Sequence, residues 1–147
     1  MRKHNGFTLI EIMVVITIIG ILVSVAAPAY NKSVDKTRRT DGQATLLQLA
    51  NTLERYYSEQ SPFTYVGATL GAGGIFPDEA PLGGDAKHYD LSFSVPVTAT
   101  TYILLATPKN GQAGDGIMTL NQAAQRGWDS DHSGVIDADE GCWVTEC

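Results

Sequence analysis

The first part of the chain contains one long apolar block. From Phe7 to Ala27 nearly every residue is apolar, and Glu11 is the single charged one. A helix of this length spans about 32 Å, which matches a hydrocarbon core of roughly 30 Å. Arg2 and Lys3 precede the block. This basic flank predicts that the N-terminal end stays in the cytoplasm and that the chain beyond Pro28 is exported.

A second pattern follows, mostly polar but with one apolar stripe. The stripe repeats at i, i+3, i+4, i+7 and i+11, which is the spacing of a single helix face. It predicts that the helix continues to about Ser58 and lays this face on a sheet. The dipeptide Ser61-Pro62 then ends the helix. The stripe consists of Leu46, Leu49, Ala50, Leu53 and Tyr57.

The rest of the chain predicts a small antiparallel sheet. Residues 62–87 are rich in glycine, proline and alanine, which is typical of a loop. Short apolar segments follow, and their short connections favour an antiparallel meander. These segments are 89–95, 101–107, 117–121 and, in shorter form, 126–128. The predicted fold class is α+β: a long N-terminal helix, hydrophobic in its first half and amphipathic in its second, packed on a small antiparallel sheet.

Composition and charge exclude some functions. A chain of 147 residues fits one compact domain plus an anchor. The formal net charge of −6 argues against nucleic-acid binding, which depends on phosphate neutralisation by lysine and arginine. The three histidines, His4, His88 and His132, show no nucleophile–base pattern, and we find no phosphate-binding loop. We therefore expect a protein that is not an enzyme.

An ordinary secretory signal or a plain anchor is the simplest alternative for the apolar block. Val25-Ala26-Ala27 has the small residues of a signal-peptidase site. The block is nevertheless longer than the apolar core of a signal peptide, which is usually about 7–15 residues. In addition, a carboxylate such as Glu11 inside a membrane segment costs roughly 2–3 kcal/mol on insertion scales. A group retained at that cost points to a function.

The segment Gly6-Phe7-Thr8-Leu9-Ile10-Glu11 resembles the cleavage and methylation motif of type IV prepilins. The resemblance implies that a prepilin peptidase cuts between Gly6 and Phe7 and that Phe7 is then N-methylated. It also implies three regions: a leader peptide at 1–6, a transmembrane and later filament-core helix at 7–28, and an exported globular pilin head at 29–147.

Two further positions of the helix match the family. Gly20 and Pro28 fall where pilins carry a glycine and a proline. Both residue types weaken helices, and proline also removes a backbone donor. We predict a helix break at these residues, which in the family lets the assembled filament stretch. A simple kink of a membrane helix is the alternative interpretation.

Cleavage gives Glu11 a specific role. It would create a charged amine at Phe7, and an amine and a carboxylate in an apolar core each suffer desolvation unless they pair. The two residues stand one helical turn apart, so the pair could form within one chain. In the family it forms between neighbouring subunits, which makes assembly depend on register.

Residues 129–140, called the oxygen-rich loop below, fit the EF-hand calcium template D-x-D-x-S-G-x-I-x-x-x-E. Gly134 provides the sharp turn of that template. Gly127 and Gly141 disfavour two flanking helices, so we predict a structural calcium clip rather than a switch. A solvated acidic turn is the alternative. The predicted calcium ligands are Asp129, Asp131, Ser133, the Val135 carbonyl, Asp137 and Glu140.

The two cysteines, Cys142 and Cys147, lie at the C-terminal end. In an exported domain such a pair favours a disulfide. Closing so short a loop would stabilise the fold by roughly 2 kcal/mol on the chain-entropy model. A zinc site formed with His132 is a poorly spaced alternative.

The resemblance implies a structural subunit of a type IV pilus, major or minor. Residues 102–143 are similar to PilE-like minor pilins, which are type IVa pilins of Gram-negative bacteria. The implied partners are the prepilin peptidase and other pilins in a helical filament of one or several subunit types. The precursor would sit in the inner membrane with its head in the periplasm, and the mature subunit in an extracellular pilus.

Two other functions stay open at this stage. A type II secretion pseudopilin shares the N-terminal motif and often binds calcium near its C-terminus. An adhesin or a DNA-uptake subunit carried on the filament is the second, although the acidic charge weighs against DNA.

Overall fold

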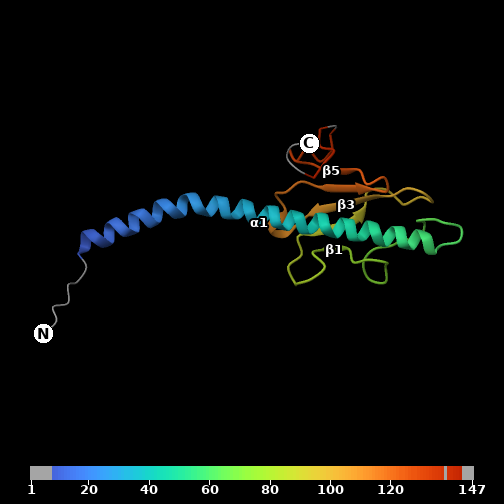
Figure 1. The fold of residues 1–147 in the computed structure, drawn as a ribbon, viewed down its shortest axis with the longest axis horizontal. Helices are drawn as coiled ribbons and strands as arrows, with labels where there is room; N and C mark the ends of the chain where they lie inside the picture. The colour runs from blue at the N-terminus through green and yellow to red at the C-terminus, as the bar shows by residue number, and fades with distance from the viewer. Residues whose placement is uncertain (1–7, 138, 144–147) are drawn as a thin grey trace. The chain divides into compact units, whose positions relative to one another are not determined.

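The computed structural model describes residues 8–137 and 139–143. Its contacts divide the chain into two compact units, Met1–Lys36 and Thr37–Cys147. A single helix, α1 (Leu9–Glu59, 51 residues), contributes to both units. Its end at Glu59 agrees with the stop predicted from Ser61-Pro62, where the chain turns toward the sheet (Figure 1).

The first unit consists of the apolar half of α1. Its large apolar side chains are exposed, from Leu9 to Val25. Among the described residues α1 is the one helix long and apolar enough to cross a membrane. In the described protein these side chains have no apolar partner, so the segment requires a lipid or protein environment to cover it.

The helix break predicted at Gly20 and Pro28 is absent from the single chain. α1 is continuous through both residues. Proline removes only one hydrogen bond of the ladder, the one that would end on the Ser24 carbonyl. The alanines on either side of Pro28 have the highest helix propensity of any residue and support the helix there. A break in the assembled filament stays a prediction.

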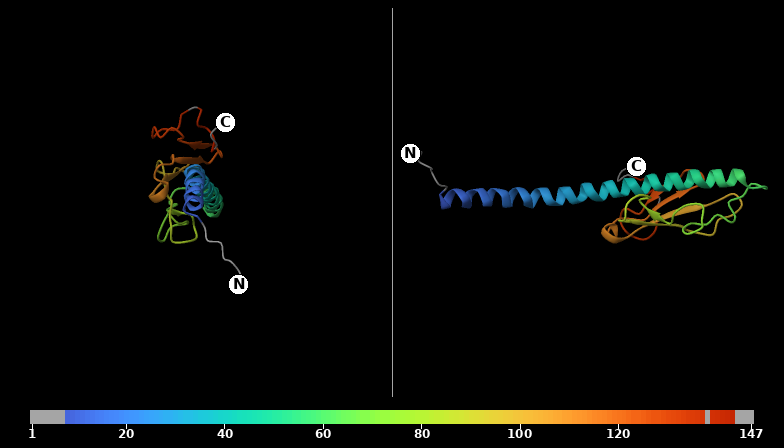
Figure 2. Two further views of the ribbon diagram at one scale, coloured as in Figure 1. Left: turned by 90° about the vertical axis from the view of Figure 1, so that its left-hand side faces the viewer. Right: turned by 90° about the horizontal axis from the view of Figure 1, so that it is seen from below.

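The second unit combines the rest of α1 with a five-stranded antiparallel sheet in the order β1-β2-β3-β4-β5. The helix lies across one face of the sheet (Figure 2). This confirms the predicted fold class and the meander. The strands are β1 (Glu79–Ala80), β2 (Tyr89–Phe93), β3 (Ile103–Pro108), β4 (Met118–Asn121) and β5 (Arg126–Trp128). A short 3-10 helix, η1 (Asn110–Gln112), follows β3.

The sequence prediction placed β1 in a loop. This strand has two residues and lies between Pro77 and Pro81, so no alternating pattern could reveal it. Its Glu79 stands directly opposite Asp90 of β2. Facing carboxylates destabilise a sheet unless a cation neutralises them. The Lys109 ammonium bonds to both carboxylates and so holds the edge together.

The core forms between the apolar stripe of α1 and the inner face of the sheet. Leu46, Leu49 and Leu53 are fully buried, and Ala50 and Tyr57 pack against them more peripherally. The stripe was therefore predicted correctly. Leu104, Met118 and Leu120 of the sheet are equally buried and complete this layer. Burial of each such side chain stabilises the fold by about 1.5–3 kcal/mol.

Gly42 sets how closely α1 approaches the sheet. A Cβ atom at this position would lie 2.8 Å from Met118 Cε and 3.0 Å from the Tyr89 ring. The helix runs through Gly42 undisturbed, although glycine has a low helix propensity. The glycine is needed for packing rather than for backbone freedom.

We predict that Gly42→Leu lowers the melting temperature of the head by several degrees. Overpacking of this kind costs about 1–3 kcal/mol, and a gain of at most about 1 kcal/mol in helix propensity does not offset it. Asn51→Leu, at an exposed position of the same helix, is the control and should melt like the wild type. Thermal unfolding followed by circular dichroism measures both. A Gly42→Leu head as stable as the control would contradict the close packing.

Candidate functional site

The first candidate site is the start of α1. Glu11 is exposed, and its backbone N–H donates to Thr8 Oγ1 at 3.3 Å. The Thr8 N–H in turn donates to Glu11 Oε2 at 3.4 Å. This reciprocal pair is a capping box, which satisfies donors that the first helical turn otherwise leaves unpaired. The Glu11 carboxylate is thus turned toward the N-terminal end of the helix.

That orientation suits the predicted role of Glu11. A carboxylate in the first turn interacts favourably with the positive end of the helix dipole. The carboxylate also faces the end of the helix at which cleavage would create the new N-terminal amine. Gly6 and Phe7, the predicted processing residues, lie outside the described residues.

The second candidate site is the oxygen-rich loop, which follows β5 directly. Its first residue, Asp129, is only 2% exposed, and its N–H donates to the Ile117 carbonyl at 2.9 Å. Glu140, at the other end, is 8% exposed. Its carbonyl accepts the Trp128 N–H at 3.1 Å. Both ends of the loop are therefore fastened beside β5.

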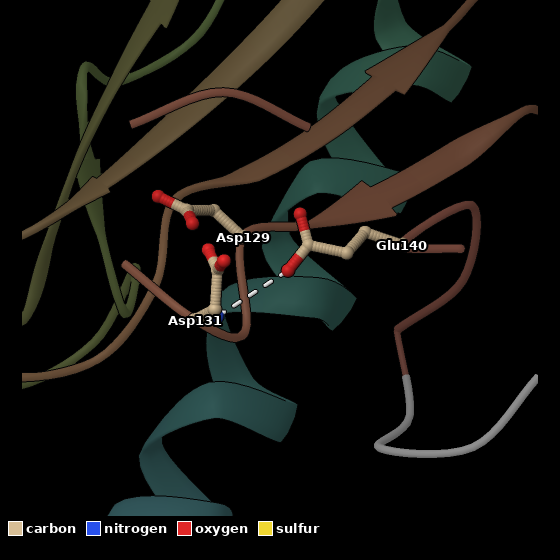
Figure 3. Close-up of side chains that lie close together, drawn as sticks. All are labelled: Asp129, Asp131 and Glu140. Carbon is tan, nitrogen blue, oxygen red and sulfur yellow. Dashed lines mark hydrogen bonds between the residues drawn. The ribbon is translucent and has the colours of Figure 1, made fainter. Parts of the chain in front are cut away.

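Three carboxylates of the loop converge (Figure 3). Asp129, Asp131 and Glu140 each offer an oxygen, and these oxygens all lie within 4.8 Å of one another. Two oxygens bound to one calcium ion at about 2.3–2.6 Å are at most roughly 5 Å apart. The cluster therefore has dimensions that a calcium ion fits.

Inward-facing N–H groups compensate these charges. Asp129 Oδ1 accepts the Ser133 N–H and its Oδ2 the Gly134 N–H, both at 2.9 Å. Glu140 Oε1 accepts the Ser130 N–H at 2.6 Å, and its Oε2 the Asp137 N–H at 3.1 Å. The bond from Asp137 is the largest influence that holds the pKa of Glu140 below its usual value. The Glu140 carboxyl group is therefore ionised at neutral pH.

The other predicted ligands are placed less uniformly. Ser133 Oγ donates to the Val135 carbonyl at 3.1 Å, so these two oxygens lie side by side. Asp137 is exposed and does not belong to the three-carboxylate cluster. Gly134 has φ 83°, which explains why glycine occupies the turn. His132 also adopts a positive φ and, although exposed, bonds through Nε2 to the Gly114 carbonyl at 2.7 Å.

The C-terminal segment follows the oxygen-rich loop directly. Cys142 is disulfide-bonded, and Cys147, the second cysteine of the chain, lies outside the described residues. Trp143 is fixed on two sides: its Nε1–H donates to the Thr119 carbonyl, and its own carbonyl accepts from Gln43 Nε2, both at 3.1 Å. These bonds join the segment to β4 and to α1.

Sequence reasoning missed a partly buried ion pair. Arg39 of α1 bonds to both carboxylate oxygens of Asp115, with its Nε at 3.0 and 2.9 Å. The Tyr89 hydroxyl at 2.6 Å and Gln112 Nε2 at 2.9 Å donate to the same carboxylate. The Arg39 guanidinium also lies 3.8 Å above the Trp128 ring. Asp115 is thus the centre of a cluster, the Asp115 cluster, that ties the helix to the sheet.

The electrostatics of the Asp115 cluster are those of a satisfied buried pair. Burial alone would raise the pKa of Asp115, but the hydrogen bonds from Arg39, Tyr89 and Gln112 together hold that pKa below its usual value. Burial, reinforced by the bond to Asp115, raises the pKa of the Tyr89 phenol. The carboxylate is therefore charged and the phenol neutral over the physiological range.

A long apolar helix that leads into a helix-on-sheet head defines the class of the protein: it is a pilin-type subunit. The comparisons with known proteins agree. Residues 28–120 match the family described as "Type IV minor pilin ComP, DNA uptake sequence receptor", and residues 1–27 match the prokaryotic N-terminal methylation motif. The chain belongs to the type IV pilin family.

Individual relatives match between 43% and 90% of the chain. Fimbrial protein EcpC of Eikenella corrodens is 30% identical over 120 residues, 79% of this chain and 70% of that protein. Type IV major fimbrial protein FimA of Dichelobacter nodosus is 28% identical over 157 residues, covering 90% and 89%. Type II secretion system core protein G of Vibrio cholerae is 36% identical over 63 residues, 43% of each chain.

A solved structure supports the fold. The minor pilin PilV of Neisseria meningitidis superposes with a TM-score of 0.50 at 22% identity, covering 67% of this chain and 89% of that one. Its fold is the one predicted here from helix and strand periodicity. Together these findings confirm the resemblance seen at Gly6–Glu11 and identify the chain as a structural pilus subunit, in a family of filament-forming proteins.

Proposed function

We propose that this subunit enters a type IV pilus rather than a secretion pseudopilus. In this account the prepilin peptidase cuts after Gly6, Phe7 is N-methylated, and Glu11 pairs with the new amine of a neighbouring subunit. The precursor would be held in the inner membrane with a periplasmic head. The exposed apolar half of α1, whose first turn is capped by the Glu11 carboxylate, carries the assembly step of this proposal.

The extent of the similarities favours the pilus over the pseudopilus. The similarity to the fimbrial protein FimA covers 90% of the chain, whereas the similarity to core protein G covers 43%. Electron microscopy of filaments sheared from the cell surface, with mass spectrometry of their protein, tests the proposal. Abundance would mark a major pilin and traces a minor one. A chain found only in a secretion apparatus would contradict it.

DNA uptake is the second candidate, because the matched family model is described as a DNA uptake sequence receptor. Charge opposes it. Loss of Arg2 and Lys3 with the leader changes the formal net charge from −6 by two units, to −8. Several cations of the head already meet carboxylates of the same chain, as Arg39 and Lys109 do. Salt-dependent DNA binding by the head would support a role in DNA uptake.

We also propose that the oxygen-rich loop holds one structural calcium ion. The support is the EF-hand spacing together with the convergence of three carboxylates. Asp129, Asp131 and Glu140 would bind the ion, with the Ser133 hydroxyl and the Val135 carbonyl as neighbouring oxygens. The calcium charge would then replace the N–H groups as the main compensation of the carboxylates.

We predict that calcium raises the melting temperature of a soluble head beginning at Tyr30. At a concentration 100 times the dissociation constant, binding stabilises by about 2.7 kcal/mol, which corresponds to several degrees. Glu140→Gln should remove most of this shift, whereas Glu59→Gln, on an exposed part of α1 outside the loop, should leave it intact. A melting temperature that neither calcium nor a chelator changes would contradict the calcium site.

A further inference from the structure

A hollow of about 440 Å³ lies beside the C-terminal segment. Its walls come from Gln43 of α1, from the β4–β5 turn at Gln125, and from the segment that ends at Trp143. Arg126 of β5 is the only charged residue among its described lining residues. The hollow therefore presents one cation between two amide side chains.

The Arg126 guanidinium is held in place by an aromatic ring. Its central carbon lies 4.8 Å from the centre of the Trp143 ring. That ring is 7% exposed and is fixed by its bond to the Thr119 carbonyl. A guanidinium resting on an aromatic face keeps its N–H donors free at the edge. Arg126 is thus oriented before any partner arrives.

Three other cations of the head form ion pairs with carboxylates of their own chain. Arg39 pairs with Asp115, Lys109 with Glu79 and Asp90, and Arg55 with Glu59. Within residues 8–137 and 139–143 the Arg126 guanidinium has no carboxylate partner, and it rests on the Trp143 ring.

Charge complementarity indicates what would occupy the hollow. Copies of the mature chain, each with a formal charge of −8, repel one another, so close packing in a filament requires cations that face carboxylates across the contact. An arginine binds a carboxylate through two parallel hydrogen bonds, which gives the contact a defined geometry. The amide groups beside Arg126 add further donors. A carboxylate is the ligand group that this combination recognises best.

We propose that Arg126 is a subunit-docking residue and that the hollow receives an acidic side chain from a second copy of this chain. This inference rests on the proposed function, because it requires that copies of the chain meet in a filament. It adds a contact of the head to the contact predicted at Glu11 in the filament core.

The test compares variants of the full-length precursor in cells that make filaments. Arg126→Glu places like charges in contact and should reduce the amount of this chain in sheared filaments at least about tenfold, the effect of losing 1.4 kcal/mol of contact energy. Arg126→Gln should lower the filament yield less than Arg126→Glu does, and Arg126→Lys, which keeps the positive charge, should lower it least. The control, Arg55→Glu, changes an arginine that is 72% exposed and should be neutral.

Two further measurements separate the outcomes. The amount of processed chain in the membrane and the melting temperature of the head should be unchanged in Arg126→Gln, so that a loss of filaments reports docking rather than folding. Wild-type filament yield from Arg126→Glu would overturn the docking role and leave the pilus function standing. If Arg126→Glu lost only DNA binding and still assembled normally, the docking role would be overturned in the same way. Absence of the wild-type chain from all filaments would overturn both.

Discussion

Replacement of Glu11 with alanine is expected to reduce filament yield at least about tenfold while the precursor still reaches the membrane. The reason is electrostatic. The amine created by cleavage and the Glu11 carboxylate both enter an apolar core, and an ion left there without its partner costs several kcal/mol. Each 1.4 kcal/mol lost from the contact lowers an association constant tenfold. Immunoblots of the sheared and membrane fractions measure the effect.

The capping box at Glu11 provides a matched control. Glutamine preserves the hydrogen bond to the Thr8 N–H but carries no charge. If the role of residue 11 is to pair with an amine, Glu11→Gln should fail nearly as badly as Glu11→Ala. If the role is only to cap the helix, Glu11→Gln should assemble normally, and that result would count against the charge pair. Asn31→Ala, at an exposed position of the same helix, should have no effect.

Removal of the Asp115 carboxylate is expected to destabilise the head strongly. Asp115→Ala would leave Arg39, which is 21% exposed, without its partner, and Tyr89 without its acceptor. Breaking a fully buried pair from one side costs about 3–5 kcal/mol, which is the upper limit for this partly buried pair. Urea unfolding of the soluble head measures the loss. Glu59→Ala breaks only an exposed pair with Arg55 and should cost less than about 1 kcal/mol.

The same cluster predicts a pH dependence. Because the folded pKa of Asp115 is held below its unfolded value, its contribution to stability is complete above the unfolded pKa, about 3.9, and is lost as pH falls through the lower folded pKa. The stability difference between wild type and Asp115→Asn should therefore be constant near neutral pH and shrink only in acid. A difference that vanishes already at pH 6 would mean that Asp115 is not paired as described.

The features predicted correctly from sequence are those encoded by local spacing. The stripe at Leu46, Leu49 and Leu53 repeats at helical intervals, and β2 alternates between buried and exposed residues. Each spacing therefore identifies the helix or strand in which it occurs. Asp129 and Glu140 are brought together by one short loop, and the template for that loop is linear. The role of Glu11 in assembly, which follows from the cleavage motif, stays a prediction.

The features that were missed depend on residues distant in the chain. Arg39 and Asp115 are 76 positions apart, and no local pattern singles out either residue. No spacing rule links a helix arginine to an aspartate between two glycines. The close approach at Gly42 was missed for the same reason, since it depends on Met118 and Tyr89 across the core.

The N-terminus of the chain in assembled filaments tests the central claim most directly. Mass spectrometry of protein sheared from the cell surface should find this chain starting at Phe7, with a methyl group on its amine and Glu11 still present. That start would show removal of the leader and retention of the apolar helix in the fibre. A filament chain that starts at Met1, a mature protein cut after Ala27, or the absence of this chain from filaments would contradict the account.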